Sequence, residues 1–155
     1  MDLETWELLS YVVTVVGLPF AIGVFLYEQR RERENEDEAI WQELSDAYVE
    51  FLNVVLANPD LKLRSHAQVA NRSEEQVERM LVIFDMLVSL FERAYLLAYE
   101  PDMSDKQRRR WHSWEDYMRE WCRIEDFRTR LPDLLRGEDS EFSAYILRLA
   151  QEESP

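Results

Sequence analysis

Residues 8–27 form an uncharged apolar stretch, which limits the possible folds of this chain more than any other feature. The stretch reads LLSYVVTVVGLPFAIGVFLY and contains no Asp, Glu, Lys or Arg. Twenty residues in a helix rise about 30 Å, which matches the thickness of the hydrocarbon layer of a bilayer. Trp6, Tyr11 and Tyr27 lie near the two ends, where aromatic rings favour the membrane–water interface. The pattern predicts a transmembrane helix.

A cleaved signal peptide is the main alternative for these residues. Such a peptide begins with a basic segment, whereas Asp2, Glu4 and Glu7 make this N-terminus acidic. Residues 21–23 resemble a cleavage site, but apolar residues continue past them to Tyr27. We therefore expect the segment to remain as an anchor.

The flanking charges predict the orientation of this anchor. Arg30, Arg31 and Arg33 follow it directly, whereas residues 1–7 contain no Lys or Arg. By the positive-inside rule, residues 1–7 lie outside the cytoplasm and the C-terminal side lies within it. The three arginines are also candidates for contact with anionic lipid headgroups or with a partner.

One face of the predicted span carries small and hydroxyl side chains. Ser10, Thr14, Gly17 and Ala21 are spaced by four, three and four residues, so they share one side of a helix. Small residues let a second helix approach closely, and hydroxyls can bond across the contact. We expect this face to mediate self-association or docking onto another membrane protein. A pore lined by Ser10 and Thr14 is the alternative, although the span contains no ionisable residue.

Residues 28–39 follow the span as a charged segment. Glu28 to Glu38 reads EQRRERENEDE, which contains no apolar residue but has opposite charges at helical spacing. We expect a solvated helical stalk about 16 Å long. A disordered charged linker is the alternative.

Residues 40–152 contain apolar stripes at helical spacing, which predict a cytoplasmic antiparallel bundle of about four helices. Asn58-Pro59 ends the first helix, and the mostly polar residues 60–72 form a loop. Ser73 and Gln76 fit a capping box that begins a second helix. This helix is apolar on so many sides that we expect it to be central.

The third predicted helix begins at Ser104, and its large apolar residues recur at three- and four-residue steps. They are Trp111, Trp114, Tyr117, Met118, Trp121 and Ile124. We expect these side chains to anchor the core, with an aromatic ligand site beside the central helix as the alternative. Leu131-Pro132 marks the next break, Gly137 ends a short apolar step, and Asp139 or Ser140 caps the last helix.

The charge of the chain excludes some partners. A net charge of −14 argues against nucleic acid, which requires a basic surface. Residues 40–152 nevertheless contain one strong basic patch, formed by Lys106, Arg108, Arg109 and Arg110. We expect these residues to contact the membrane surface or an acidic partner, or to pair internally with the excess carboxylates.

The sequence offers little catalytic chemistry. It contains two histidines and one cysteine, and it lacks a glycine-rich phosphate loop, a nucleophile elbow, and CxxC or HExxH motifs. We therefore predict no catalytic residue, no cofactor and no metal site. His112 and Asp116 fit a helix-surface pair, and Cys122 fits a buried apolar side chain.

The order of these signals resembles that of small uncharacterised bacterial membrane proteins with a cytosolic helical domain. The shared features are the N-terminal anchor, Asn58-Pro59, Trp111 with Trp114, Asp126-Phe127-Arg128, Glu141-Phe142 and Tyr145. The resemblance implies a place in the bacterial inner membrane and no known activity.

Together these features favour a membrane-anchored, non-enzymatic interaction or oligomerisation module, for example an accessory subunit of a membrane complex. Its expected partners are the lipid bilayer and either itself or another membrane protein. The alternatives are a membrane-anchored enzyme or ligand-binding helical domain, and a small homo-oligomeric channel.

Overall fold

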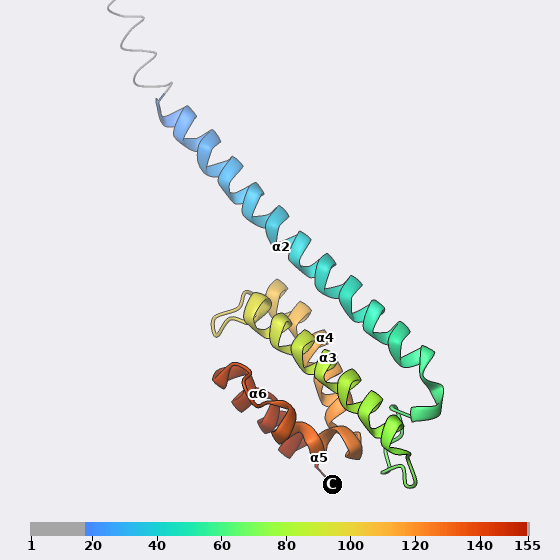
Figure 1. The fold of residues 1–155 in the computed structure, drawn as a ribbon. Helices are drawn as coiled ribbons and strands as arrows, with labels where there is room; N and C mark the ends of the chain where they lie inside the picture. Colours follow the sequence, from blue (N-terminus) through green and yellow to red (C-terminus); the bar gives the residue numbers. More distant parts are fainter. Residues whose placement is uncertain (1–17, 155) are drawn as a thin grey trace, which may run out of the picture. The chain divides into compact units, whose positions relative to one another are not determined.

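The chain is helical throughout the part that the structure describes. The computed structural model describes residues 18–154, without the side chain at position 34. This part contains five α-helices, one 3₁₀ helix and no strand, so the predicted all-α class is confirmed. The elements, labelled in Figure 1, are α2 (Leu18–Ala57), η2 (Pro59–Leu61), α3 (Glu74–Ala98), α4 (Asp105–Cys122), α5 (Glu125–Leu134) and α6 (Ser140–Glu152).

The chain divides after Ile40 into two units, residues 1–40 and residues 41–155. In the first unit, α2 is continuous from Leu18 and includes residues 28–39. The predicted stalk is therefore helical, and the disordered linker was the wrong alternative. Its described side chains are exposed to solvent, as expected for a segment that lacks apolar residues.

Local side-chain bonds begin the helices of the second unit. Ser73 and Gln76 form the predicted capping box, in which the Ser73 hydroxyl accepts from the Gln76 amide and the Gln76 side chain accepts from the Ser73 amide. Ser104 begins α4 through the same box. Asp139 caps α6 by accepting from the amides of Glu141 and Phe142, both at 2.9 Å. Each cap satisfies backbone donors that a helix start leaves unpaired.

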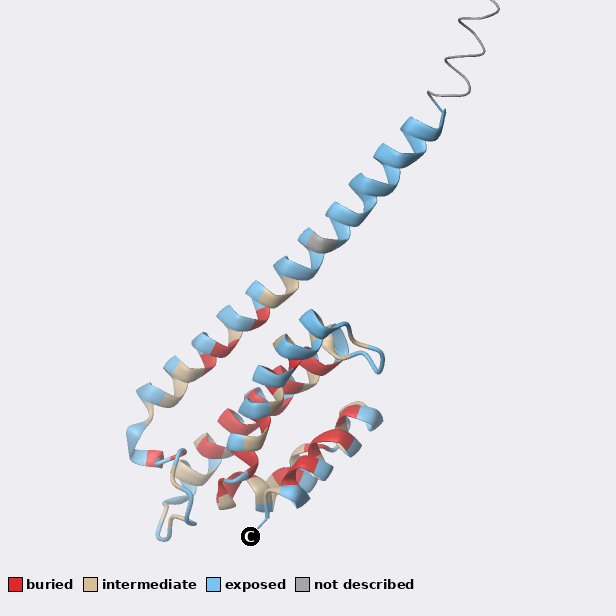
Figure 2. Cartoon of the chain, turned by 180° about the vertical axis from the view of Figure 1, so that it is seen from behind, coloured by how far each residue is buried: buried red, intermediate tan, exposed pale blue. Residues whose placement is uncertain are grey.

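Helix α3 packs against α4, α5 and α6, and α4 likewise packs against α3, α5 and α6, so these contacts do not distinguish α3 as the predicted central helix. Its buried residues, which include Phe84 and Phe91, lie on one broad face, whereas the apolar residues Val82, Met86 and Leu97 outside that face are exposed. The Phe84 ring lies edge-on to Trp121 and to Phe127, at centroid distances of 6.4 and 5.3 Å. Figure 2 shows the buried residues of the bundle helices on the faces that they turn toward one another.

One predicted boundary was wrong. The third helix was predicted to include Ile124 and to continue to a break at Leu131-Pro132. In the structure α4 ends at Cys122, and α5 already begins at Glu125. The Arg128 side chain donates to the carbonyls of Cys122 and Arg123, at 2.9 and 3.3 Å. These bonds satisfy the end of α4 without a Gly or Pro signal. Pro132 consequently lies inside α5, near its C-terminal end, and not in a first helical turn.

The expected antiparallel packing is correct for some helix pairs only. Within residues 41–155, α2 and α3 are antiparallel, since Glu43 pairs with Arg93 and Asn58 with Arg79. By contrast, α4 and α6 run in the same direction, because Trp111 bonds Tyr145 and Arg119 bonds Glu153. Helix α5, which was not predicted as a separate helix, lies between α4 and α6 in the chain and returns it to the end of the bundle where α4 begins.

The segment between η2 and α3 is more than the polar loop that was predicted. Leu61 and Leu63 are buried, and Arg72 reaches from this segment to Asp126 of α5. The Arg72 Nη1 to Asp126 Oδ2 distance is 2.6 Å, and both side chains are only 5–6% exposed. Arg72 also donates twice to the Leu61 carbonyl. The loop is therefore fixed to the bundle.

Candidate functional site

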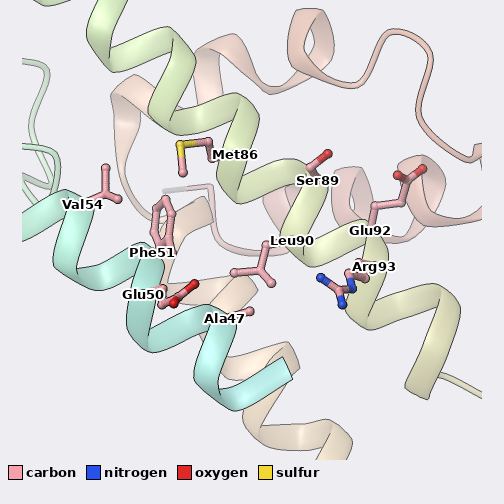
Figure 3. Close-up of a pocket in the computed structure, with 9 residues that line it drawn as sticks. All are labelled: Ala47, Glu50, Phe51, Val54, Met86, Ser89, Leu90, Glu92 and Arg93. Atoms are coloured by element: carbon pink, nitrogen blue, oxygen red, sulfur yellow. The ribbon is translucent and has the colours of Figure 1, made fainter. Parts of the chain in front are cut away.

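A groove lies between α2 and α3 of the bundle. Its larger part encloses about 610 Å³ and is lined from α2 by Ala47, Glu50, Phe51 and Val54 (Figure 3). On α3 the groove is bordered by residues 86–93. Phe51 and Leu90 are buried and form its apolar floor, whereas Met86 is 45% exposed on the wall.

The groove continues toward the end of α2. A second hollow of about 370 Å³ shares Val54 and Met86 with the first and extends to Asn58 and Arg79. Val82, which is 53% exposed, stands on its α3 wall. The two hollows therefore form one apolar channel that follows α3 from Arg93 to Glu75, about 27 Å along the helix axis.

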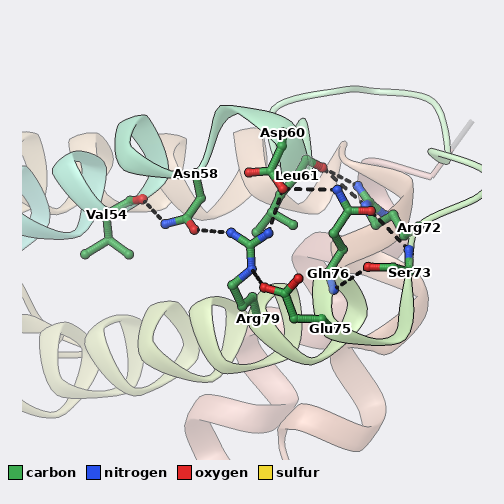
Figure 4. A network of polar contacts seen from close by, with 9 residues as sticks. All are labelled: Val54, Asn58, Asp60, Leu61, Arg72, Ser73, Glu75, Gln76 and Arg79. Carbon is green, nitrogen blue, oxygen red and sulfur yellow. Dashed lines mark hydrogen bonds and ion pairs between the residues drawn. The ribbon is translucent and has the colours of Figure 1, made fainter.

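A polar cluster closes the channel where α2 ends (Figure 4). Arg79 donates to the Asn58 side-chain oxygen at 2.7 Å and to Asp60 at 2.6 Å, and it pairs with Glu75 at 2.9 Å. Hydrogen bonds from Gln76 and Arg79 lower the pKa of the Asp60 carboxyl. Because the cluster joins α2, η2 and α3, it fixes the width of the channel at this end.

The other end of the channel is also held by charged groups. Arg93 pairs with Glu43 of α2. Glu92, which borders the groove, accepts from the Asp139 amide at 2.5 Å and shares a hydrogen bond with Glu138. That bond, partial burial and the charge of Glu92 raise the pKa of Glu138 to about 7.

Two carboxylates on the rim have no partner. Glu50 of α2 and Glu78 of α3 are exposed, and no residue between 18 and 154 forms an ion pair or hydrogen bond with either side chain. Both rim arginines are already paired within the bundle. The channel thus combines an apolar floor with uncompensated negative charge, which suits an apolar ligand that carries positive charge at its edge.

A chain of buried and half-buried polar groups joins α4 to α6, away from the groove. Trp111 Nε1 donates to the Tyr145 hydroxyl at 2.9 Å, and this hydroxyl donates to Glu115 at 2.6 Å. Burial alone would raise the pKa of Glu115, but bonds from Tyr145 and Arg119 lower it overall. Arg119 continues the chain to Glu153. All of these side chains form bonds that link the two helices.

The aromatic residues of α4 do not support the alternative of an aromatic ligand site. Trp111, Trp114 and Trp121 are at most 3% exposed. Rings from α2, α3, α5 and α6 contact them, so the space beside the central helix is filled. These tryptophans therefore act as core residues.

The predicted helix-association face lies mostly outside the described residues. Ser10, Thr14 and Gly17 belong to the part of the chain that is not described, and Ala21 is exposed on α2. Among residues 18–154, no helix is both long enough and apolar enough to cross a membrane. The predicted span 8–27 begins before these residues, so the prediction is not tested over its full length.

The two predicted basic groups occupy different units. Arg30, Arg31 and Arg33 are exposed on the first unit's part of α2. The second group, Lys106 with Arg108, Arg109 and Arg110, begins α4, and its first three members are exposed.

Several bonds involve the second basic group. Arg108 donates to the Met103 carbonyl and Arg109 to the Asp105 carbonyl. Arg110 lies 5.8 Å from the centroid of the Trp41 ring. These contacts go to two backbone carbonyls and one aromatic ring, so they do not test the predicted pairing with carboxylates.

The groups considered for chemistry are not assembled into a site. His66 and His112 are exposed, and Cys122 is buried. Burial raises the pKa of the Cys122 thiol to about 12. Within residues 18–154, no cluster of three or more His, Cys, Asp or Glu side chains is arranged to hold a metal ion.

Only a partial signal for the groove is visible in the sequence. Val82 and Met86 are apolar residues one turn apart within the second predicted helix. Nothing in the sequence placed either residue opposite Val54 of α2. Against known protein families, curated proteins and solved structures, the chain gives no match.

Proposed function

We propose that this protein is a membrane-anchored, non-enzymatic interaction module, in which residues 8–27 lie in the bilayer and the bundle binds a partner through the α2–α3 groove. The supporting observation is the exposure of seven large apolar side chains in residues 18–27. They are 40–72% exposed and comprise Leu18, Phe20, Ile22, Val24, Phe25, Leu26 and Tyr27.

Leaving these side chains in water is energetically costly. Complete burial of one large apolar side chain contributes about 1.5–3 kcal/mol, so seven correspond to about 10–20 kcal/mol. The sequence continues the uncharged stretch back to Leu8, which extends it to the length of a bilayer. Lipid is the environment that can cover apolar side chains on every side of a single helix.

The orientation follows from Arg30, Arg31 and Arg33, which place the bundle in the cytoplasm by the positive-inside rule. The small face that includes Gly17 and Ala21 would then join this helix to a second copy or to another membrane protein. A bundle whose aromatic core is filled and whose hollow faces outward is suited to binding a macromolecular partner.

Alkaline extraction of native membranes tests the anchor. We expect the wild-type chain to stay in the membrane pellet, and the double variant Phe20→Glu/Val24→Glu to be released. Each charge within the span opposes insertion by up to about 2.5–3.5 kcal/mol. The matched control Val49→Glu/Leu56→Glu places the same charges on exposed apolar positions of α2 outside the span, and it should stay in the pellet. A wild-type chain that is soluble without detergent would refute the anchor.

Crosslinking in the same membranes tests association through the small face. We expect a specific crosslinked species that Gly17→Leu/Ala21→Leu abolishes, because the larger side chains keep the helices apart. Ile22→Leu, a volume-conserving change, serves as control and should leave the species intact. If the Leu variant crosslinks as the wild type does, this face is not the contact.

A further inference from the structure

We infer that the α2–α3 groove binds a basic amphipathic helix from a partner protein. This inference rests on the proposed interaction function and specifies its ligand. The channel is bounded by two antiparallel helices, so a third helix lying between them would complete a layer of the bundle. Its length of about 27 Å corresponds to about 18 helical residues.

The floor and walls of the groove suit an apolar stripe. Phe51 and Leu90 supply a buried floor, while Val82 and Met86 stand exposed one turn apart on α3. A helix lying in such a groove anchors itself with residues at three- and four-residue spacing. The flexible Met86 side chain lies where the two hollows meet, and it can adapt its conformation to the bound side chains.

The charges of the rim specify a basic ligand. Glu50 and Glu78 stand on opposite walls without a partner among residues 18–154. The cations that border the channel, Arg79 and Arg93, are already paired with Asp60 and Glu43. Lys or Arg residues beside the apolar stripe of a ligand helix would therefore meet unpaired carboxylates, whereas acidic residues there would be repelled.

A second copy of this chain is a weaker candidate, because the chain carries 32 acidic and 18 basic residues. The basic start of α4 is its most cationic helix segment, but the apolar stripe of that helix is buried among tryptophans. The stripe is therefore not available to a neighbouring molecule. A partner of different sequence fits the groove better.

Methyl NMR of the full chain in zwitterionic nanodiscs tests the inference. The chain has five methionines, and ¹³C-methyl labelling reports on each. Met86 borders the groove, whereas Met80 and Met118 are buried in the core. The probe is a synthetic helix of about 18 residues with Leu on one face and Lys on the other. We expect a saturable shift of the Met86 methyl, with Met118 unchanged.

Variants locate the contact. Val82→Lys should abolish the Met86 shift, whereas the control Leu56→Lys, at an exposed α2 position away from the groove lining, should leave it unchanged. Glu50→Gln/Glu78→Gln should weaken binding about tenfold, since surface ion pairs each contribute modestly. Glu100→Gln/Asp102→Asn removes the same charge from the exposed α3–α4 connection, and it should have no effect.

Four results would overturn the inference. These are an unchanged Met86 methyl, equal binding of a peptide with Glu in place of Lys, a Met86 shift on raising the protein concentration alone, and a shift caused by lipid alone. The third would identify a second copy as the occupant, and the fourth a lipid. Membrane retention and crosslinking through Gly17 and Ala21 do not depend on the groove, so the proposed membrane anchor and its association face would survive any of these results on their own tests.

Discussion

Replacing Arg72 with Met should destabilise the bundle more than any change to its surface ion pairs. Arg72 and Asp126 form a salt bridge in which both side chains are 5–6% exposed. The Met side chain retains most of the aliphatic stem but leaves the Asp126 carboxylate buried. Its one remaining hydrogen bond comes from the Val69 amide at 3.4 Å, which is long.

The magnitude follows from the contacts that are lost. Removing one partner of a buried ion pair costs about 3–5 kcal/mol, because the other charge stays in a poorly solvated place. The Leu61 carbonyl also loses two donors from Arg72, which adds about 1 kcal/mol. We therefore expect Arg72→Met to lower the free energy of unfolding by about 4–6 kcal/mol. That is a large fraction of a typical total of about 5–15 kcal/mol.

Urea unfolding of the full chain, followed by near-ultraviolet circular dichroism, measures this loss through the packed tryptophans. The midpoint should fall by about 2–3 M if the urea dependence is about 2 kcal/mol per molar. The double variant Arg72→Met/Asp126→Leu should recover at least half of the loss, because it no longer buries an unpaired charge. Arg136→Met provides the control, since its pair with Asp133 is 81% and 76% exposed and should contribute less than about 1 kcal/mol.

Two results would refute this reasoning. If Arg72→Met costs no more than Arg136→Met, the bridge does not hold the 60–72 segment. If the double variant is as unstable as Arg72→Met alone, the loss comes from the Leu61 carbonyl and not from the stranded carboxylate.

Two further changes test the turn between α5 and α6. The pKa of Glu138 is raised to about 7 in the folded protein, so its protonated form contributes stability that is complete below about pH 4.5 and is lost as the pH rises through 7. In urea unfolding, Glu138→Gln should therefore match the stability of the wild type at pH 4.5 and exceed it at pH 8 by about 1 kcal/mol after solvent screening. If the two proteins are equally stable at both pH values, Glu138 does not share a hydrogen bond with Glu92. Gly137→Ala should lower the melting temperature and cost about 1 kcal/mol. The cost comes from the backbone, because φ is +97° at this position, and not from a clash, because an added Cβ meets no atom within 4 Å. An unchanged melting temperature would show that the turn relaxes.

The features that the sequence predicted well are those set by neighbouring residues. Ser73, Ser104 and Asp139 cap helices because the backbone donors they satisfy lie two or three residues away. The aromatic stripe of α4 was recognised as core because its spacing follows the turn of one helix. Periodicity also suggested a central position for α3, but several of the apolar residues behind that prediction, among them Met86 and Leu97, are exposed.

The features that it missed depend on residues far apart in the chain. Arg72 and Asp126 are 54 positions apart, so neither residue alone indicates a buried bridge. The end of α4 is satisfied by the Arg128 side chain from the next helix, where a sequence reading looks for Gly or Pro. The groove is also a tertiary feature, because Val54 and Met86 become neighbours only when α2 packs against the bundle.

The groove itself follows from how side-chain size is distributed around α2. On one side Tyr48 and Phe51 direct large rings toward α4, where Tyr48 stacks on Tyr117 at 4.4 Å and Phe51 meets Trp121 at 5.5 Å. On the side facing α3, positions 47, 50 and 54 carry only Ala, Glu and Val. Such small side chains cannot fill the space between α2 and α3, because the large rings on the other side of α2 determine how far apart the helices lie. Apolar surface therefore stays open, although larger residues at these positions would stabilise the bundle. An unfilled surface beside unpaired carboxylates is what a binding role predicts, because a partner helix would complete the packing that the chain leaves unfinished.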